Sequence, residues 1–246
     1  MTFPVDLLET LVAARSVAVL TGAGVSKESG IPTFREAQTG LWAQYDPMQL
    51  ATPAAFLRDP ALVWNWYQWR RDLVAKCEPN AGHQALVEIE GMFEVVSLIK
   101  QNVEGFHRRA SSHKVIEVHG NIMRSKRFSD NVLVEAWDES DEVPPRCPAT
   151  GDMLRPDVVW FGESLPAGSL EQAIAAAANC DVFFSLGTSG EVQPAASLPL
   201  QAVRGGGILV EINPQETPIS RHAQYVLNGP SGAVLPELVR ALRNGD

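Results

Sequence analysis

The sequence predicts an α/β fold in which a doubly wound, Rossmann-like parallel sheet carries helices on both faces. Short apolar runs alternate with segments of helical periodicity, as expected for strands that are buried on both faces. A glycine-rich stretch, residues 21–35, directly follows the first apolar run and supplies the small residues that a tight strand-to-helix turn needs. Polar residues follow five of the predicted strands, and a parallel sheet brings such positions to one edge.

The first half of the chain begins this alternation. Leu7, Leu8, Leu11 and Val12 recur at helical spacing, so a helix precedes the first strand. Between residues 34 and 59 we expect a loop, because one glycine and several prolines interrupt any long element there. In chain order, we predict helix, strand, helix, helix and strand at residues 5–15, 17–20, 61–76, 83–90 and 93–99.

The second half continues with a β-branched strand at residues 115–118. Residues 124–137 have the pattern of a hairpin that turns at 129–131, and an acidic linker follows at 138–142. Strands and helices then alternate again, as in units of a parallel sheet. We predict strands at residues 157–161, 181–186, 207–212 and, at the sheet edge, 225–227, with helices at 169–179, 198–203 and 231–243.

Composition restricts the class of protein. A chain of 246 residues with 45% hydrophobic and 20% charged residues fits a globular protein with one sizeable core. Its formal net charge of -9 argues against nucleic acid or an anionic membrane as a partner. The three cysteines are far apart, no signal peptide is visible and no apolar run reaches membrane-spanning length, so we expect a cytoplasmic protein.

The polar residues at the strand ends predict a ligand crevice. A glycine turn or a single histidine is often purely structural, and Gly22 and Gly24 alone would also fit a steric turn. Five strand ends that carry amide, hydroxyl or imidazole groups, taken together, support a shared ligand site much more strongly than one such strand end does. These ends lie at residues 22–24, 101–102, 119–120, 187–189 and 213–215.

These segments resemble the motifs of the sirtuins, a family of NAD-dependent protein lysine deacylases, over almost the whole chain. The matching segments occur in the family's order, at residues 22–26, 30–35, 101–107, 119–120, 156–163, 187–189 and 212–213. The resemblance implies that NAD is consumed as a co-substrate and that the partners are acylated lysine side chains of proteins. It assigns NAD binding to Gly22, Ala23, Gly24, Thr33, Phe34, Arg35, Trp42, Gln101, Asn102, Glu104, His119, Gly187, Thr188, Ser189, Asn213, Pro214, Gln215 and Ser231.

The resemblance also assigns roles within the reaction. His119 would be the general base, since an imidazole with a pKa near neutrality can take a proton from a ribose hydroxyl. Asn102 would act with it, while Phe34 and Arg35 would lie on a loop closing over the nicotinamide ribose. Nicotinamide would leave, and the acyl group would pass to ADP-ribose. An extended substrate peptide would bind along Val159, Trp160, Phe161 and Gly162.

Tyr67 and Arg70 predict the acyl group. Residues three apart share a helix face, and taken alone this pair also fits an amphipathic helix with a buried aromatic and a solvated arginine. The segment, however, resembles the sirtuin class with a Tyr-x-x-Arg pair in the acyl pocket, and Ala51 resembles the small residue that leaves room there. A guanidinium can pair with a carboxylate through two parallel hydrogen bonds. We therefore expect succinyl- and malonyl-lysine to be preferred over acetyl-lysine.

Two departures from the family pattern are visible. Sirtuins usually carry four cysteines that bind a structural zinc, but the corresponding positions here are Arg127, Asp130, Cys147 and Thr150. One thiolate cannot make a closed tetrahedral site, so we predict no zinc. Glu104 stands where the family usually has aspartate, which makes nicotinamide affinity and turnover the properties most exposed to change.

The resemblance implies one catalytic domain over residues 1–246, with a large lobe (1–35, 81–120, 156–246) and a small lobe (36–80, 121–155). Two other functions remain open at this point. The same NAD site could serve mono-ADP-ribosyl transfer to a protein, or the chain could be a non-catalytic module that binds NAD or ADP-ribose.

Overall fold

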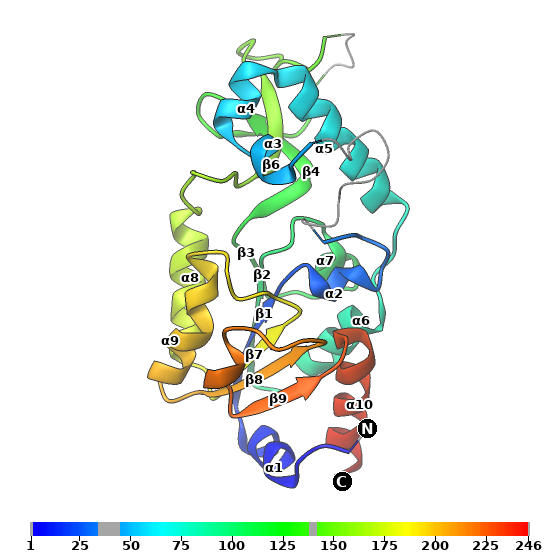
Figure 1. Cartoon of the computed structure of the whole chain (residues 1–246), viewed down its shortest axis with the longest axis vertical. Coiled ribbons are helices and arrows are strands. Elements are labelled where there is room, and N and C mark those ends of the chain that lie inside the picture. Colours follow the sequence, from blue (N-terminus) through cyan, green and yellow to red (C-terminus); the bar gives the residue numbers. More distant parts are fainter. Residues whose placement is uncertain (1, 34–44, 138–141, 246) are drawn as a thin grey trace.

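The computed structural model describes residues 2–33, 45–137 and 142–245, and its centre is a six-stranded sheet (Figure 1). The strand order is β3-β2-β1-β7-β8-β9, and every neighbouring pair is parallel. The strands are β1 Ser16–Thr21, β2 Val95–Lys100, β3 Val115–Glu117, β7 Val182–Leu186, β8 Ile208–Asn213 and β9 Tyr225–Asn228. The predicted doubly wound parallel sheet is confirmed, and its order reverses between β1 and β7.

Helices cover both faces of this sheet (Figure 1). In β1, Val17 and Val19 pack with one set of helices while Ala18 and Leu20 pack with the other, because side chains alternate along a strand. One face carries α1 Val5–Ala13, α6 Ala81–Glu90 and α10 Ser231–Asn244; the other carries α8 Ala167–Ala178, α9 Leu198–Arg204 and the 3-10 turn Ala195–Ser197. In the part of the chain that the structure describes, none of the helices is long and apolar enough to cross a membrane.

A second, smaller sheet lies at the other end of the molecule, packed against the long helix α5 Pro60–Ala75 (Figure 1). It has three antiparallel strands in the order β5-β4-β6, namely β4 Gly120–Arg127, β5 Leu133–Val134 and β6 Leu154–Val158. The predicted hairpin is therefore confirmed in β4 and β5. A two-residue link, Val118 and His119, joins β3 of the large sheet to β4 of the small one.

Two predicted elements were wrong. Residues 47–58 were expected in a loop, but they contain the short helices α3 Pro47–Leu50 and α4 Pro53–Arg58. Proline is well tolerated in the first turn of a helix, and the Thr52 hydroxyl caps α4 by accepting from the Ala55 N–H. The strand expected at 157–161 in the parallel sheet is β6, which ends at Val158 and pairs antiparallel with β4. An apolar run does not reveal the direction of its partner.

In the described part of the chain, four short elements have no counterpart in the sequence prediction. They are α2 Gly24–Lys27, α7 Phe106–Arg109 and the 3-10 turns Ala195–Ser197 and Ser220–His222. The first two follow β1 and β2 directly and lie at the sheet edge where the predicted site residues gather.

Candidate active site

The carboxyl ends of the parallel strands meet at one edge, and backbone hydrogen bonds join them. The Gln101 N–H donates to the Thr21 carbonyl at 3.0 Å, and the Gly22 N–H donates to the Leu186 carbonyl at 2.9 Å. The Gly187 N–H donates to the Ile212 carbonyl at 3.0 Å. The sheet order reverses at this edge, which is where open α/β sheets bind ligands. The predicted convergence of the strand ends is confirmed.

The glycine-rich turn interlocks with the turn that follows β7. The Gly24 N–H donates to the Gly187 carbonyl at 2.8 Å. A Cβ placed on Gly22 would lie 2.6 Å from the Thr188 Cα, and one on Gly24 would lie 2.7 Å from the Gly187 carbonyl oxygen. Gly187 itself has a φ of +55°, a region that glycine enters without strain. These glycines are required by the contact between two backbones, whatever ligand the edge binds.

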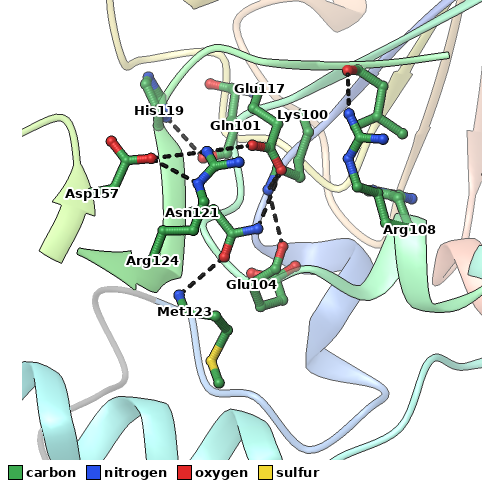
Figure 2. A network of polar contacts seen from close by, with 12 residues as sticks. Lys100, Gln101, Glu104, Arg108, Glu117, His119, Asn121, Met123, Arg124 and Asp157 are labelled. Carbon is green, nitrogen blue, oxygen red and sulfur yellow. Dashed lines mark hydrogen bonds and ion pairs between the residues drawn. The ribbon is translucent and has the colours of Figure 1, made fainter. Parts of the chain in front are cut away.

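His119 lies beside the loop that follows β2 (Figure 2). Its Nδ1 is 2.8 Å from the Gln101 carbonyl oxygen, which can only accept, so Nδ1 carries the proton and Nε2 presents a lone pair. Burial lowers the pKa of His119, the Gln101 carbonyl opposes this, and the charge of Lys100 lowers it further. The Gln101 side chain in turn donates to the Thr188 hydroxyl at 3.1 Å. The imidazole is therefore neutral at pH 7 and has a defined tautomer.

A buried polar cluster lies behind this loop, between α2 and α6. Ser26 donates to Glu104 Oε1 at 2.5 Å and accepts from the Asn102 side-chain amide at 3.1 Å. Its hydroxyl is also 3.5 Å from His83 Nε2. Burial lowers the pKa of His83 to about 4, and desolvation together with the charges of His83 and Lys100 keeps the pKa of His107 well below its usual value.

Ser26 and His83 were not predicted to lie in this cluster. Ser26 belongs to the glycine-rich motif, which was the available signal. His83 follows a Pro-Asn-Ala-Gly break far along the chain, and nothing local in the sequence indicated that α6 would bring it here.

The predicted acyl-pocket residues are brought together on α5 and after β6. The Trp160 indole N–H donates to the Tyr67 hydroxyl oxygen at 3.0 Å, and both side chains are buried. Burial raises the pKa of Tyr67 to about 12. The Arg70 guanidinium lies over the rings of Trp66 and Tyr67, with its carbon 5.1 and 5.9 Å from their centroids. Arg70 also lines a small cavity together with Glu104, Ile31, Pro32, Trp69, Leu73, Val74, Val103 and Ile122.

The segment after β6 joins this pocket to the sheet edge. The Val159 N–H donates to the His119 carbonyl at 3.0 Å, and the Phe161 N–H donates to the Ala51 carbonyl at 2.9 Å. Phe161 and Gly162 are exposed, and Gly162 has a φ of +88°. The predicted substrate-binding residues thus lie between the His119 edge and the Tyr67 cluster.

The remaining residues predicted to bind NAD lie along the ends of β7 and β8 and at the start of α10. Thr188 and Ser189 follow β7, while Pro214 and Gln215 follow β8 in an exposed loop after Asn213. Ser231 begins α10 and is buried, and its hydroxyl has no hydrogen-bond partner within the described ranges. Thr33 is the last residue before a gap in the described chain, and Phe34, Arg35 and Trp42 lie outside the described residues.

The four positions where the resemblance places zinc-binding cysteines lie close together, in β4 and in turns beside the small sheet. Arg127 Nε and Nη2 donate to the two Asp130 carboxylate oxygens at 2.9 and 2.5 Å. Hydrogen bonds from Thr150 and Arg127 lower the pKa of the Cys147 thiol. Across residues 2–33, 45–137 and 142–245, no three His, Cys, Asp or Glu side chains are grouped so that they could hold a metal ion. A guanidinium offers no lone pair to a metal, so this set of side chains does not fit zinc.

Comparisons with known proteins agree with this geometry. A sequence model of the Sir2 family matches residues 22–194. "NAD-dependent protein deacylase 1" of Pseudomonas aeruginosa is 48% identical over 242 residues, which are 95% of this chain and 97% of that protein. "NAD-dependent protein deacylase 1" of Archaeoglobus fulgidus is 46% identical over 239 residues, covering 96% and 97%.

Two solved structures are also similar to this chain in both fold and sequence. The crystal structure of a Sir2 homolog–NAD complex has a TM-score of 0.92 at 45% identity and covers 99% of this chain and 95% of that one. A structure of Sir2 bound to acetylated peptide has a TM-score of 0.80 at 31% identity, covering 98% and 97%.

Proposed function

Because the chain belongs to the Sir2 family, we propose that it is an NAD-dependent protein lysine deacylase that prefers succinyl- and malonyl-lysine to acetyl-lysine. Its products would be the free lysine, nicotinamide and O-acyl-ADP-ribose. The observation that carries the acyl preference is the group formed by the buried Tyr67 and Trp160 and the half-buried Arg70.

NAD would lie along the carboxyl edge of the parallel sheet. One observation supports this fit: the buried Ser231 hydroxyl lacks a protein partner within the described ranges. The predicted NAD-binding set from Gly22 to Ser231 would hold it, with Gln101, Asn102 and Glu104 at the nicotinamide end. When bound, NAD supplies the ribose carbon that accepts the acyl oxygen once nicotinamide leaves.

His119 would be the general base. Its proton is held on Nδ1 by the Gln101 carbonyl, so Nε2 is the atom that would take a proton from a ribose hydroxyl. Its lowered pKa keeps the imidazole unprotonated at neutral pH. Asn102 is fixed by its hydrogen bond to Ser26 and would help to orient the ribose.

The acyl preference follows from the kinds of donor that Tyr67 and Arg70 bring to the pocket. The Trp160 N–H occupies an acceptor position on the Tyr67 oxygen, and the phenol stays protonated because burial raises its pKa to about 12. The Tyr67 O–H is therefore a hydrogen-bond donor, and we propose a ligand oxygen as its acceptor. The Arg70 guanidinium lies against the same ring. A carboxylate at the end of a succinyl or malonyl chain would accept from both groups, whereas an acetyl methyl would accept from neither.

The experiment is a comparison of acyl substrates. Peptides that differ only in carrying succinyl-, malonyl- or acetyl-lysine are incubated with protein and NAD, and free lysine peptide and nicotinamide are followed by mass spectrometry. The proposal expects NAD-dependent removal of all three groups, fastest for succinyl and malonyl, and none with His119→Ala. Nicotinamide release without peptide deacylation, or a preference for acetyl, would contradict it.

We further propose that the small sheet binds no zinc and is held instead by the Arg127–Asp130 ion pair and by packing of Trp64, Cys147 and Leu154 with Val134 and Trp137. The support is the donor set itself, which offers one thiol beside a guanidinium. Metal analysis of the purified protein tests this, and stoichiometric zinc would refute it.

A further inference from the structure

Lys100 is a buried cation that the proposed reaction does not use. It is the last residue of β2, flanked by β1 and β3, and 1% of its surface is exposed. An ammonium so far from water is strongly disfavoured unless it is paired and hydrogen-bonded. The hydrogen-bond partners of the Lys100 ammonium therefore show which parts of the structure it connects.

The Lys100 ammonium contacts both the loop after β2 and the end of β3 (Figure 2). Lys100 Nζ donates to the Glu104 backbone carbonyl at 3.1 Å and to Glu117 Oε1 at 2.8 Å. Glu104 belongs to the loop that carries Gln101 and Asn102, and Gln101 in that loop fixes the His119 tautomer. Glu117 ends β3, two residues before His119. We call residues 101–105, between β2 and α7, the nicotinamide loop. The Lys100 side chain thus joins this loop to β3, which leads into His119.

The contacts continue into the small sheet with alternating charge. Glu117 Oε2 accepts from Arg124 at 2.7 Å, Arg124 is 2.8 Å from Asp157, and Asp157 is 3.5 Å from Lys126 Nζ. We call these five residues, Lys100, Glu117, Arg124, Asp157 and Lys126, the inter-sheet ion network. It starts on β2 and β3 of the large sheet and ends on β4 and β6 of the small one, alongside the link that contains His119 (Figure 2).

We propose that Lys100 is a positioning residue for the reaction: through Glu104 and Glu117 it fixes the nicotinamide loop and His119 relative to each other. This proposal rests on the function proposed above and adds a residue to that site. The charged groups that face this region are Lys100 on β2, Glu117 on β3, Arg124 on β4, Asp157 on β6 and Glu104 in the loop. The buried His107 on α7 is also close enough for the Lys100 charge to lower its pKa. Lys100 and Glu117 carry opposite charges and are in direct contact. Removing the Lys100 charge should therefore raise the pKa of His119, and removing the Glu117 charge should lower it.

The test uses two variants and the pH dependence of kcat/KM, whose acidic limb reports the protonation of the free enzyme's base. Lys100→Met removes the cation at similar length, so the acidic limb should move to higher pH by about half a unit or more. Glu117→Gln keeps the shape and an acceptor oxygen, and it leaves the Lys100 charge less compensated, so the limb should move to lower pH. Both variants should lose about 10- to 100-fold in kcat/KM, because the base and the loop are no longer held in register.

Lys114→Met is the matched control, since Lys114 precedes β3 with an exposed side chain and should leave the profile unchanged. Shifts of the same sign in the two variants, or no shift, would overturn the proposal, because a merely structural loss does not change sign. If Lys100→Met does not fold, the downward shift of the isosteric Glu117→Gln decides the question. Absence of any deacylase activity in the wild-type protein would refute the proposed function itself, which is a separate result.

Discussion

Replacing Arg70 by methionine tests the acyl preference most directly. Methionine keeps an unbranched stem that can pack on Trp66 and Tyr67, over which the guanidinium now lies. The variant therefore loses the charged donors while retaining much of the apolar packing. For a succinyl substrate the loss is a charge-assisted pair of hydrogen bonds, about 1.5–3 kcal/mol. At about 1.4 kcal/mol per tenfold, kcat/KM for desuccinylation should fall roughly 10- to 150-fold.

An acetyl group has no carboxylate to lose, so kcat/KM for deacetylation should stay within about threefold of wild type in the same variant. Both constants are measured on peptides of one sequence, with product followed by mass spectrometry. Arg58→Met is the control, because Arg58 ends α4 on the exposed surface and removes the same charge. Equal fold losses for the two acyl groups would refute the assignment of Arg70 to the acyl carboxylate.

Three further predictions concern stability, metal and the glycine turn. The folded pKa of His83, about 4, is below the ordinary value near 6.5, so the folded protein binds fewer protons than the unfolded chain between these values. Stability is therefore retained above pH 6.5 and lost as the pH falls toward 4. His83 contributes about 3 kcal/mol to that loss and His107, whose pKa is also lowered, adds to it; urea unfolding at pH 7.5 and 4.5 measures the difference, and a flat profile would contradict it. A strong chelator should leave Tm unchanged, since the side chains around Cys147 do not fit zinc, and a drop in Tm that added zinc reverses would count against this. Gly24→Ala should weaken NAD binding measured by calorimetry by tenfold or more, because its Cβ would meet the Gly187 carbonyl at 2.7 Å, whereas Gly168→Ala in α8, with nothing within 4 Å, should bind normally.

The sheet and its functional edge were predictable because their signals are local. Apolar runs that end in Gln101, His119 or Gly187 show both where a strand lies and where it stops. Once the strands are parallel, the position of those ends follows from geometry. The placement of His119 next to Gln101 was thus contained in the order of motifs, although the tautomer required the 2.8 Å contact.

What the sequence did not reveal depends on tertiary contacts. Prolines 47 and 53 suggested a loop, but each stands at the start of a short helix, where its missing N–H has no consequence. The burial of His83 behind Ser26 depends on how α6 packs against the sheet, which no local pattern encodes. Lys100 looked like the polar end of a strand, and only the structure shows it paired to Glu117 and Glu104 inside the protein.

The interlocked turns at Gly24 and Gly187 have a consequence for how this edge can change over evolutionary time. Each turn fills the space that a side chain on the other would need, so neither glycine can be replaced while the other turn stays where it is. The two turns come from β1 and β7, more than 160 residues apart in the chain, yet they form a single mutational unit. Divergence among such enzymes should therefore concentrate away from these turns, for example beside the small sheet, where Arg127 stands at a position that the family usually gives to cysteine, while the edge at Gly24 and Gly187 is inherited whole.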